Sequence, residues 1–357
     1  MKTPASESAS ESWRSASPYP LRLRPILFEK VWGGRRLERF GKSLPPGTNI
    51  GESWELADMP ATSPTGGGGG AARSVIDNGP LAGRTLHDAM ELWGRDLLGD
   101  ARPTEGGDFP LLVKLLDARE NLSVQVHPSP AYAAAHPEAR LKTECWFVLD
   151  AEPGSVIYKG VKPGVTRASF GARIADGSVA GDLVAVPAVP GECHTLPSGT
   201  VHALGAGVVV AEVQTPSDTT FRVFDWGRTG RALHVREALE CIDFGPAPPA
   251  TRMEDRTTSP LGPPATRLAT NEFFAIEGTT RFGRVADSAA CVVLIIVRDG
   301  ISLRSRTPSP PTVASIGATV VVPAAVASDW NMATGEGTRL LRVTLAPRPR
   351  PARPHRA

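Results

Sequence analysis

Residues 191–205 read GECHTLPSGTVHALG, which is the strongest local signal in the chain. It follows the pattern G-x5-P-x-G-x2-H, with Gly191, Pro197, Gly199 and His202 at the defined positions. A proline and a glycine two residues apart are typical of a tight turn. In a β-sandwich, such a turn directly before a strand places the histidine inside, near the open end. The stretch therefore predicts a β-sandwich that carries an inward-facing imidazole at one end.

Short apolar runs extend on both sides of this stretch, from Phe109 onward. They are separated by Gly, Pro, Asn and Asp, and they include FPLLVKLLDARENLSVQVHP, TECWFVLD, SVIYKG and VVVAEVQTP. This texture is typical of an antiparallel sandwich or barrel. A second β-rich stretch, residues 267–346, contains GATVVVP, in which Gly317 and Pro323 repeat the spacing of GECHTLP. Because one sandwich needs only about 100–150 residues, we expect a mainly β chain with two jelly-roll β-sandwich domains.

The rest of the chain differs from these strands in composition. The segment RTLHDAMELWGRDLLG places apolar side chains at helical spacing after Thr85, which can cap a helix. We therefore expect a small helical segment near 85–99 within the first domain. The predicted organisation, in chain order, is a disordered tail (1–20), a catalytic domain (21–244), a linker (245–266), a second β domain (267–346) and a Pro/Arg-rich tail (347–357).

Composition excludes several classes of protein. The 357 residues carry 39 Lys and Arg against 37 Asp and Glu, a net charge of only +2. This charge is too small to indicate a nucleic acid partner. No apolar run approaches the roughly 20 residues that span a membrane, and the first 20 residues lack the apolar core of a secretory signal. The four cysteines form no CxxC pair, which favours reduced thiols in a cytoplasmic protein. We expect a monomer or a small homo-oligomer.

Four residues offer ligands for a metal ion. Gln125 and His127 in SVQVHP are two positions apart, so they point to the same face of a strand. Glu144 follows in TECW, and His202 follows the turn described above. One amide oxygen, two imidazoles and one carboxylate suit a borderline divalent cation and leave room for water or substrate. The sequence therefore predicts a divalent metal site formed by Gln125, His127, Glu144 and His202.

Two resemblances follow from these motifs. The turn at 191–205 resembles the second motif of the cupin superfamily, with Ala206 where that motif has asparagine. Residues 21–240 are similar to the type I mannose-6-phosphate isomerases, in GESWELAD, FPLLVKLLDARENLSVQVHPSPAYAAAHP, LKTECWFVL, LPSGTVHALGAG and VAEVQTPSDTTFRVFDWGR. The resemblance implies two cupin-type domains and zinc-dependent interconversion of mannose 6-phosphate and fructose 6-phosphate through a cis-enediol. The second domain lacks histidines at the corresponding turn, so we expect it to bind no metal.

The resemblance also implies roles for individual residues. The four ligands named above would hold one zinc ion per chain. Arg222 in TTFRVFDW matches the family's active-site arginine, and Lys114 in LLVKLLD matches a pocket lysine proposed to transfer a proton. Lys142 matches a position of the substrate pocket, and we expect it to contact the phosphate of a small phosphosugar. A desolvated lysine and a metal-bound water are both open as the catalytic base.

Two other functions use the same fold and ligands. A cupin oxygenase would hold Fe(II) on two histidines and one carboxylate. Gln125 as a fourth ligand, and the cations Arg222 and Lys114, favour an anionic sugar instead. A non-catalytic sugar-binding cupin is the other alternative, and loss of a ligand or of Arg222 would have indicated it.

Overall fold

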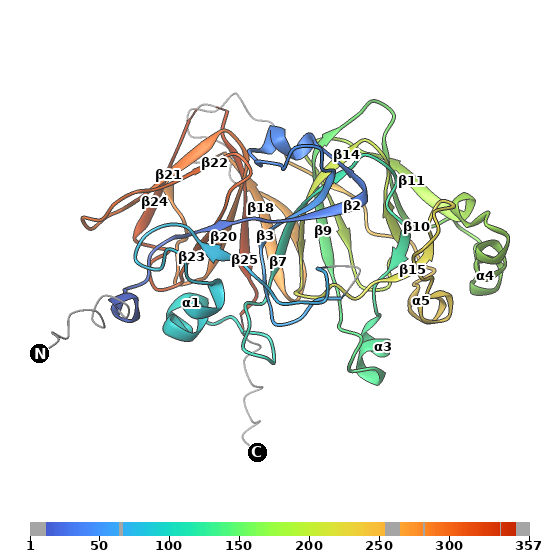
Figure 1. The fold of residues 1–357 in the computed structure, drawn as a ribbon, viewed down its shortest axis with the longest axis horizontal. Helices are drawn as coiled ribbons and strands as arrows, with labels where there is room; N and C mark the ends of the chain where they lie inside the picture. The colour runs from blue at the N-terminus through green and yellow to red at the C-terminus, as the bar shows by residue number, and fades with distance from the viewer. Residues whose placement is uncertain (1–11, 64–66, 254–264, 281–282, 336, 348–357) are drawn as a thin grey trace, which may run out of the picture. The chain divides into compact units, whose positions relative to one another are not determined.

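The computed structural model describes residues 12–63, 67–253, 265–280, 283–335 and 337–347. They form antiparallel sheets with few helices, so the predicted mainly β fold is confirmed (Figure 1). The chain divides into two compact units, each assembled from separate stretches of sequence. The central unit comprises Arg24–Ser74 and Leu111–Arg256, and the terminal unit comprises Met1–Leu23, Val75–Pro110 and Thr257–Ala357. No helix among the described residues is long and apolar enough to span a membrane.

The central unit is a β-sandwich. Its larger sheet has seven strands, which are in spatial order β16 (Thr251–Arg252), β12 (Glu192–Leu196), β9 (Glu144–Ala151), β14 (Val208–Gln214), β7 (Leu112–Ala118), β3 (Ile50–Leu56) and β2 (Ile26–Gly34). Its smaller sheet has five strands, in the order β11 (Leu183–Pro187), β10 (Val156–Val161), β13 (His202–Leu204), β8 (Val124–Val126) and β15 (Phe221–Phe224). Two short strands, β4 (Asp58–Met59) and β5 (Ala72–Arg73), pair separately.

Alternation along the smaller sheet decides which side chains face inward. In β8, Val124 and Val126 join an outer apolar cluster with Phe170 and Ala238, whereas Gln125 between them points to the opposite face. Figure 1 shows α4 and α5, which carry Phe170 and Ala238, beside this sheet. The helices of this unit are α3 (Pro130–Ala135), α4 (Arg167–Asp176), α5 (Val235–Cys241) and the 3₁₀-helices η2 (Arg36–Phe40) and η3 (Val179–Asp182).

Apolar side chains form most of the interior of the sandwich. Trp146 from the larger sheet and Ile157 and Leu204 from the smaller sheet belong to one buried cluster. Strands β7 and β14 are buried along their whole length, which explains why their sequences are nearly continuous apolar runs. Two of the charged exceptions within these runs, Lys114 and Glu212, lie in the site described below.

The terminal unit is a second sandwich with its own core. Its larger sheet has the order β17 (Thr266–Thr270), β18 (Phe274–Thr279), β25 (Arg339–Leu345), β20 (Val292–Arg298), β23 (Thr319–Val322), β1 (Leu21–Arg24) and β6 (Val75–Ile76). Its smaller sheet has the order β19 (Gly283–Arg284), β24 (Trp330–Thr334), β21 (Gly300–Ser305) and β22 (Thr312–Ser315). Leu294 and Val320 from one sheet pack with Leu303 and Trp330 from the other, as expected for a jelly roll.

The predicted helical segment is present as two helices. Thr85 caps α1 (Leu86–Trp93) in a capping box with Asp88, so the predicted cap is confirmed. Gly94, with φ of 46°, separates α1 from α2 (Arg95–Leu98). Both helices group with the terminal unit, whereas the sequence analysis assigned them to the catalytic domain. The difference arises because the terminal unit is discontinuous in sequence.

The predicted ends and linker contain more structure than their composition indicated. Residues 12–20 of the expected disordered tail include the 3₁₀-helix η1 (Ser12–Ser15), and Tyr19 packs edge-on against Trp93. Aromatic side chains thus supply burial that a count of Ser, Glu and Pro overlooks. Part of the expected linker forms β16, which pairs with β12. Residues 1–11, 254–264 and 348–357 lie outside the described residues, and the predicted domain boundaries stay a prediction.

Candidate active site

Strand register sets one row of polar and aromatic side chains on the inner face of each sheet of the central unit. The row of the smaller sheet runs across β15, β8, β13 and β10 and consists of Arg222, Gln125, His202 and Lys159. The row of the larger sheet runs across β7, β14, β9 and β12 and consists of Lys114, Glu212, Trp146 and His194. Directly paired residues present their side chains on the same face. The rings of Trp146 and His202, with centroids 5.2 Å apart, bring the two rows into contact.

The turn that the sequence analysis singled out positions His202. The amide of Thr200 donates to the carbonyl of Pro197 at 3.0 Å, which closes the turn. Gly199 has φ of 89°, and a Cβ there would lie 2.9 Å from the carbonyl oxygen of Cys241. The position therefore requires glycine. The turn directs the Thr200 carbonyl toward His202, whose Nδ1 lies 2.8 Å from it.

Three of the four predicted ligands converge on one point. His127, Glu144 and His202 are buried, and their ligand atoms lie within 4.8 Å of one another. Nε2 of His127 is 3.4 Å from one oxygen of Glu144, and Nε2 of His202 is 3.2 Å from the other. The group combines residues from β9 and β13 with a residue just after β8.

Backbone carbonyls fix the imidazole orientation. His127 Nδ1 lies 3.0 Å from the carbonyl of Thr219, as His202 Nδ1 lies beside that of Thr200. A carbonyl can only accept, so each Nδ1 carries the proton and each Nε2 presents its lone pair. This arrangement, with the second ring nitrogen held by a carbonyl, is typical of histidines that bind metal.

Electrostatics favour a cation at this point. Burial, followed by the charge of Lys142, lowers the pKa of His127 to about 3, so its imidazole is neutral. Burial opposes ionisation of Glu144, but the positive charge of the Lys142 ammonium outweighs it and holds the pKa of Glu144 well below the usual range. Within the described residues, His127 Nε2 and both Glu144 oxygens are buried and accept no hydrogen bond of good geometry, although the ammonium of Lys142 makes an ion pair with one of these oxygens. Buried acceptors facing one another fit a divalent metal ion.

Gln125 and Lys142 adjoin this group. The amide nitrogen of Gln125 is 3.3 Å from Nε2 of His202, so rotation of the amide by 180° would bring its oxygen to the same place. The Lys142 ammonium lies 2.7 Å from the Glu144 carboxylate and is 4% exposed. The structure thus brings both predicted residues to the ligand group.

Lys114 lies between two carboxylates that the sequence analysis did not single out. Its Nζ is 3.3 Å from Glu212 and 3.6 Å from Glu52, and it lies 4.8 Å from the ring centre of Trp54. Burial lowers the pKa of Lys114, but the charges of Glu212 and Glu52 outweigh this and raise it above its ordinary value. Lys114 is therefore a fixed cation in the free protein.

Arg222 is buried, and a backbone carbonyl fixes one end of its guanidinium group. Its guanidinium donates to the carbonyl of Ala232 at 2.9 Å, and its Nε has no hydrogen-bond partner among the described residues. Burial, followed by the charge of Arg231, lowers the pKa of Arg222, which nonetheless stays protonated because arginine begins so high. Arg222 therefore presents an unused donor next to Gln125 in the row.

One cavity lies beside the ligand group, and its lining among the described residues does not include His127, Glu144 or His202 themselves. It has a volume of about 80 Å³, and Gln125, Lys114, Lys142 and Arg222 all line it. The acidic residues missing from the sequence analysis, Glu52 and Glu212, line it too. Both lie in motifs quoted there, GESWELAD and VAEVQTP, and a charged residue inside a buried strand was the signal that could have identified them.

Fold and site together define a cupin-type β-sandwich protein with a buried metal-binding group. The family profile of the catalytic domain of type I phosphomannose isomerases matches residues 21–147. The probable mannose-6-phosphate isomerase GmuF of Bacillus subtilis is 40% identical over 235 residues, which cover 63% of this chain and 68% of that protein. The chain belongs to the type I phosphomannose isomerase family.

Solved structures agree with this assignment. The crystal structure of the mannose 6-phosphate isomerase from Bacillus subtilis is similar, with a TM-score of 0.76 and 29% identity over 91% of this chain and 99% of that one. A crystal structure of a mannose 6-phosphate isomerase bound with zinc and yttrium has a TM-score of 0.63 and 19% identity, covering 92% and 99%. At that identity the second likeness concerns the fold alone.

Proposed function

We propose that this protein interconverts mannose 6-phosphate and fructose 6-phosphate and depends on zinc. The observation that carries the proposal is the convergence of His127, Glu144 and His202. Gln125 and Lys142, which adjoin this group, line one cavity with Arg222 and Lys114. The relatives named above include a probable mannose-6-phosphate isomerase and a solved mannose 6-phosphate isomerase, both from Bacillus subtilis. Four buried cysteines remain free thiols, which supports the cytoplasm as its compartment.

The residues that would hold zinc are His127, Glu144, His202 and Gln125. Two neutral imidazoles and a carboxylate are a ligand set that zinc commonly takes, and an amide oxygen completes four. When bound, the ion would orient the sugar and polarise its oxygens.

The chain's own charges fit the proposed cis-enediol route. From mannose 6-phosphate, a proton leaves C2 and one is gained at O1; then O2 loses a proton and C1 gains one. Negative charge develops on the oxygens between these steps. Arg222, with its unused donor, and Lys114, as an ammonium, would stabilise it without rearranging. Lys142, which lies beside the metal-ligand group, would contact the phosphate of the substrate.

The first test is the reaction itself. Purified full-length protein supplied with zinc should convert mannose 6-phosphate to fructose 6-phosphate, and a chelator should reduce the rate by at least about 100-fold, because the ion polarises the reacting oxygens. Readdition of zinc should restore the rate. A folded, zinc-loaded sample that yields no fructose 6-phosphate would overturn the proposal, and oxygen uptake with Fe(II) would favour the oxygenase.

Lys114 should act as a cation and not as the base. We expect Lys114→Met to lower kcat about 100-fold or more, since it leaves Glu52 and Glu212 facing each other, while Lys114→Arg should stay within about tenfold of the wild type. Arginine cannot give up its proton at working pH, so it separates the two roles. The measurement is kcat with zinc content and thermal unfolding as controls. An arginine variant that is folded, zinc-bound and as inactive as the methionine variant would contradict the cation role.

A further inference from the structure

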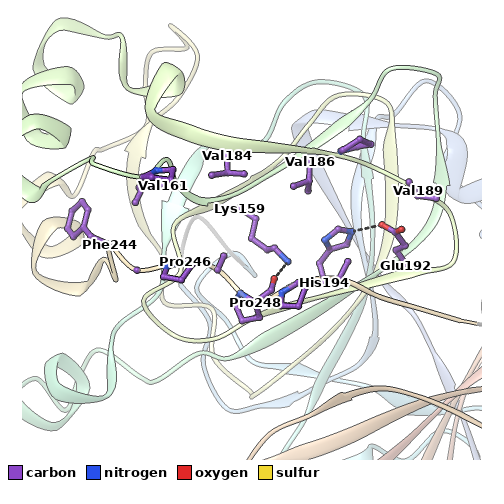
Figure 2. Close-up of a pocket in the computed structure, with 16 residues that line it drawn as sticks. Lys159, Val161, Val184, Val186, Val189, Glu192, His194, Phe244, Pro246 and Pro248 are labelled. Atoms are coloured by element: carbon purple, nitrogen blue, oxygen red, sulfur yellow. Dashed lines mark hydrogen bonds and ion pairs between the residues drawn. The ribbon is translucent and has the colours of Figure 1, made fainter.

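A second cavity of the central unit lies where the two rows end. It has a volume of about 680 Å³ and is lined by β10, β11, β12 and residues 244–250 (Figure 2). Small-molecule sites typically measure roughly 300–1,000 Å³. In the described part of the chain, the two cavities share no lining residue. The second cavity is therefore a separate site.

Most of its wall is apolar. Val184 and Val186 of β11 line one side, and Val189 lines the end toward β12. Pro246 and Pro248 of the segment 244–250 line the opposite side (Figure 2). Such a wall favours the apolar body of a ligand.

The polar groups of the cavity come from the last residues of the rows. Lys159, at the end of the smaller-sheet row beside His202, is 5% exposed, and its ammonium donates to the carbonyl of Pro248 at 2.6 Å. His194, at the end of the larger-sheet row beside Trp146, is 1% exposed. Within the described residues, neither ring nitrogen of His194 has a hydrogen-bond partner. Figure 2 shows both side chains directed into the same space.

These groups leave one positive charge deep in the cavity. In the described part of the chain, Lys159 makes no ion pair, and burial lowers its pKa. Burial, followed by the charge of Lys159, lowers the pKa of His194 to about 4, so the imidazole is neutral at pH 7. The remaining ionisable group of the lining is Glu192, which is partly exposed and lies 3.7 Å from Nε2 of His194. Glu192 stabilises this ammonium only from a distance, without an ion pair, so a carboxylate on a ligand that reaches Lys159 directly would relieve the penalty of its burial.

We propose that this cavity binds a small monocarboxylic acid with an apolar body. The carboxylate accepts hydrogen bonds from Lys159 and from one N–H of His194, and the body lies against the valines and prolines. A single negative charge matches the single ammonium. A phosphate dianion would place a second charge near Glu192 without compensation. The site is thus distinct in ligand chemistry from the phosphosugar cavity.

The test uses 3-phenylpropanoate as probe and zinc-loaded full-length protein in titration calorimetry. We expect a Kd of about 1 mM or tighter for the wild type. The neutral amide 3-phenylpropanamide should bind at least about tenfold more weakly, because it lacks the charge that pairs with Lys159. Equal binding of acid and amide, or no binding of the acid at millimolar concentration, would overturn the proposal.

Variants assign the binding to this cavity. Lys159→Met should lower the affinity for 3-phenylpropanoate at least about tenfold. The matched control is Lys162→Met, because exposed Lys162 also donates to one carbonyl, that of Gly181, outside the cavity. Its affinity should match that of the wild type. Glu192→Gln should tighten binding, since it removes the like charge. Unchanged affinity in a folded Lys159→Met protein, or weaker binding in Glu192→Gln, would contradict the site.

Two further measurements keep the result decisive. If Lys159→Met fails to fold, His194→Gln should lower the affinity for 3-phenylpropanoate. Unchanged affinity in that variant would overturn the proposal. The probe should also bind chelator-treated protein as tightly as the zinc-loaded form. Binding lost with the metal would mean that the carboxylate ligates the catalytic ion instead, which would overturn it too.

Discussion

Replacement of His202 by alanine is expected to abolish both zinc binding and isomerase activity while the protein stays folded. His202 contributes one of three convergent buried ligand atoms, and its Nδ1 is held by the Thr200 carbonyl. Loss of partners outside the ligand shell already costs roughly 10–100-fold in metal affinity, so loss of a direct ligand should cost more. We expect zinc content close to zero after dialysis, and a rate at least about 1,000-fold below the wild type.

The control is His136→Ala. His136 follows α3 and stacks on Tyr132 at a centroid distance of 4.1 Å. It does not belong to the convergent ligand group, so its variant should retain zinc and rate. Metal analysis of both variants, with circular dichroism to show that each is folded, decides the outcome. Full zinc occupancy in folded His202→Ala would refute the ligand assignment.

The second large effect is expected from Arg222→Lys, which should lower kcat about 100-fold while zinc content stays unchanged. Lysine keeps the charge but lacks the planar fork of donors, and it cannot both contact the Ala232 carbonyl and present the unused Nε donor. Because the lost donor is proposed to act on charge that develops during the reaction, kcat should fall more than KM rises.

Arg228→Lys is the matched control for this variant. Arg228 pairs with Asp225 at 2.8 Å and donates to the Asn121 carbonyl, and it does not line the catalytic cavity. Its kcat should stay within about threefold of the wild type. An unchanged kcat in Arg222→Lys would remove Arg222 from the catalytic group.

Features encoded locally could be predicted from the sequence. The turn before His202 depends on Pro197 and Gly199. The two-residue spacing of Gln125 and His127 places both side chains on the same face of a strand. Likewise, Thr85 and the apolar spacing after it predict α1. Each of these signals lies within a few residues, so neighbours in sequence suffice to interpret it.

Features that depend on strand order could not be predicted in this way. Glu212 lies beside Lys114 only because β14 pairs with β7, although the two residues are 98 positions apart in the sequence. The sequence analysis therefore interpreted Lys114 as a possible base, because it lacked the carboxylates that keep the lysine protonated. The cavity at Lys159 and His194 likewise exists only where β10 and β12 approach each other in the folded sandwich.

The two rows also have a consequence for folding kinetics. Their members come from strands spread between Lys114 and Arg222, and each row is complete only when four strands have found their partners. Contacts between distant parts of a chain form slowly, because loop closure must precede them. We therefore expect a refolding chain to gain zinc affinity in its last phase. The rate of zinc uptake would then equal the rate at which the sandwich closes, and not the rate at which any single hairpin forms.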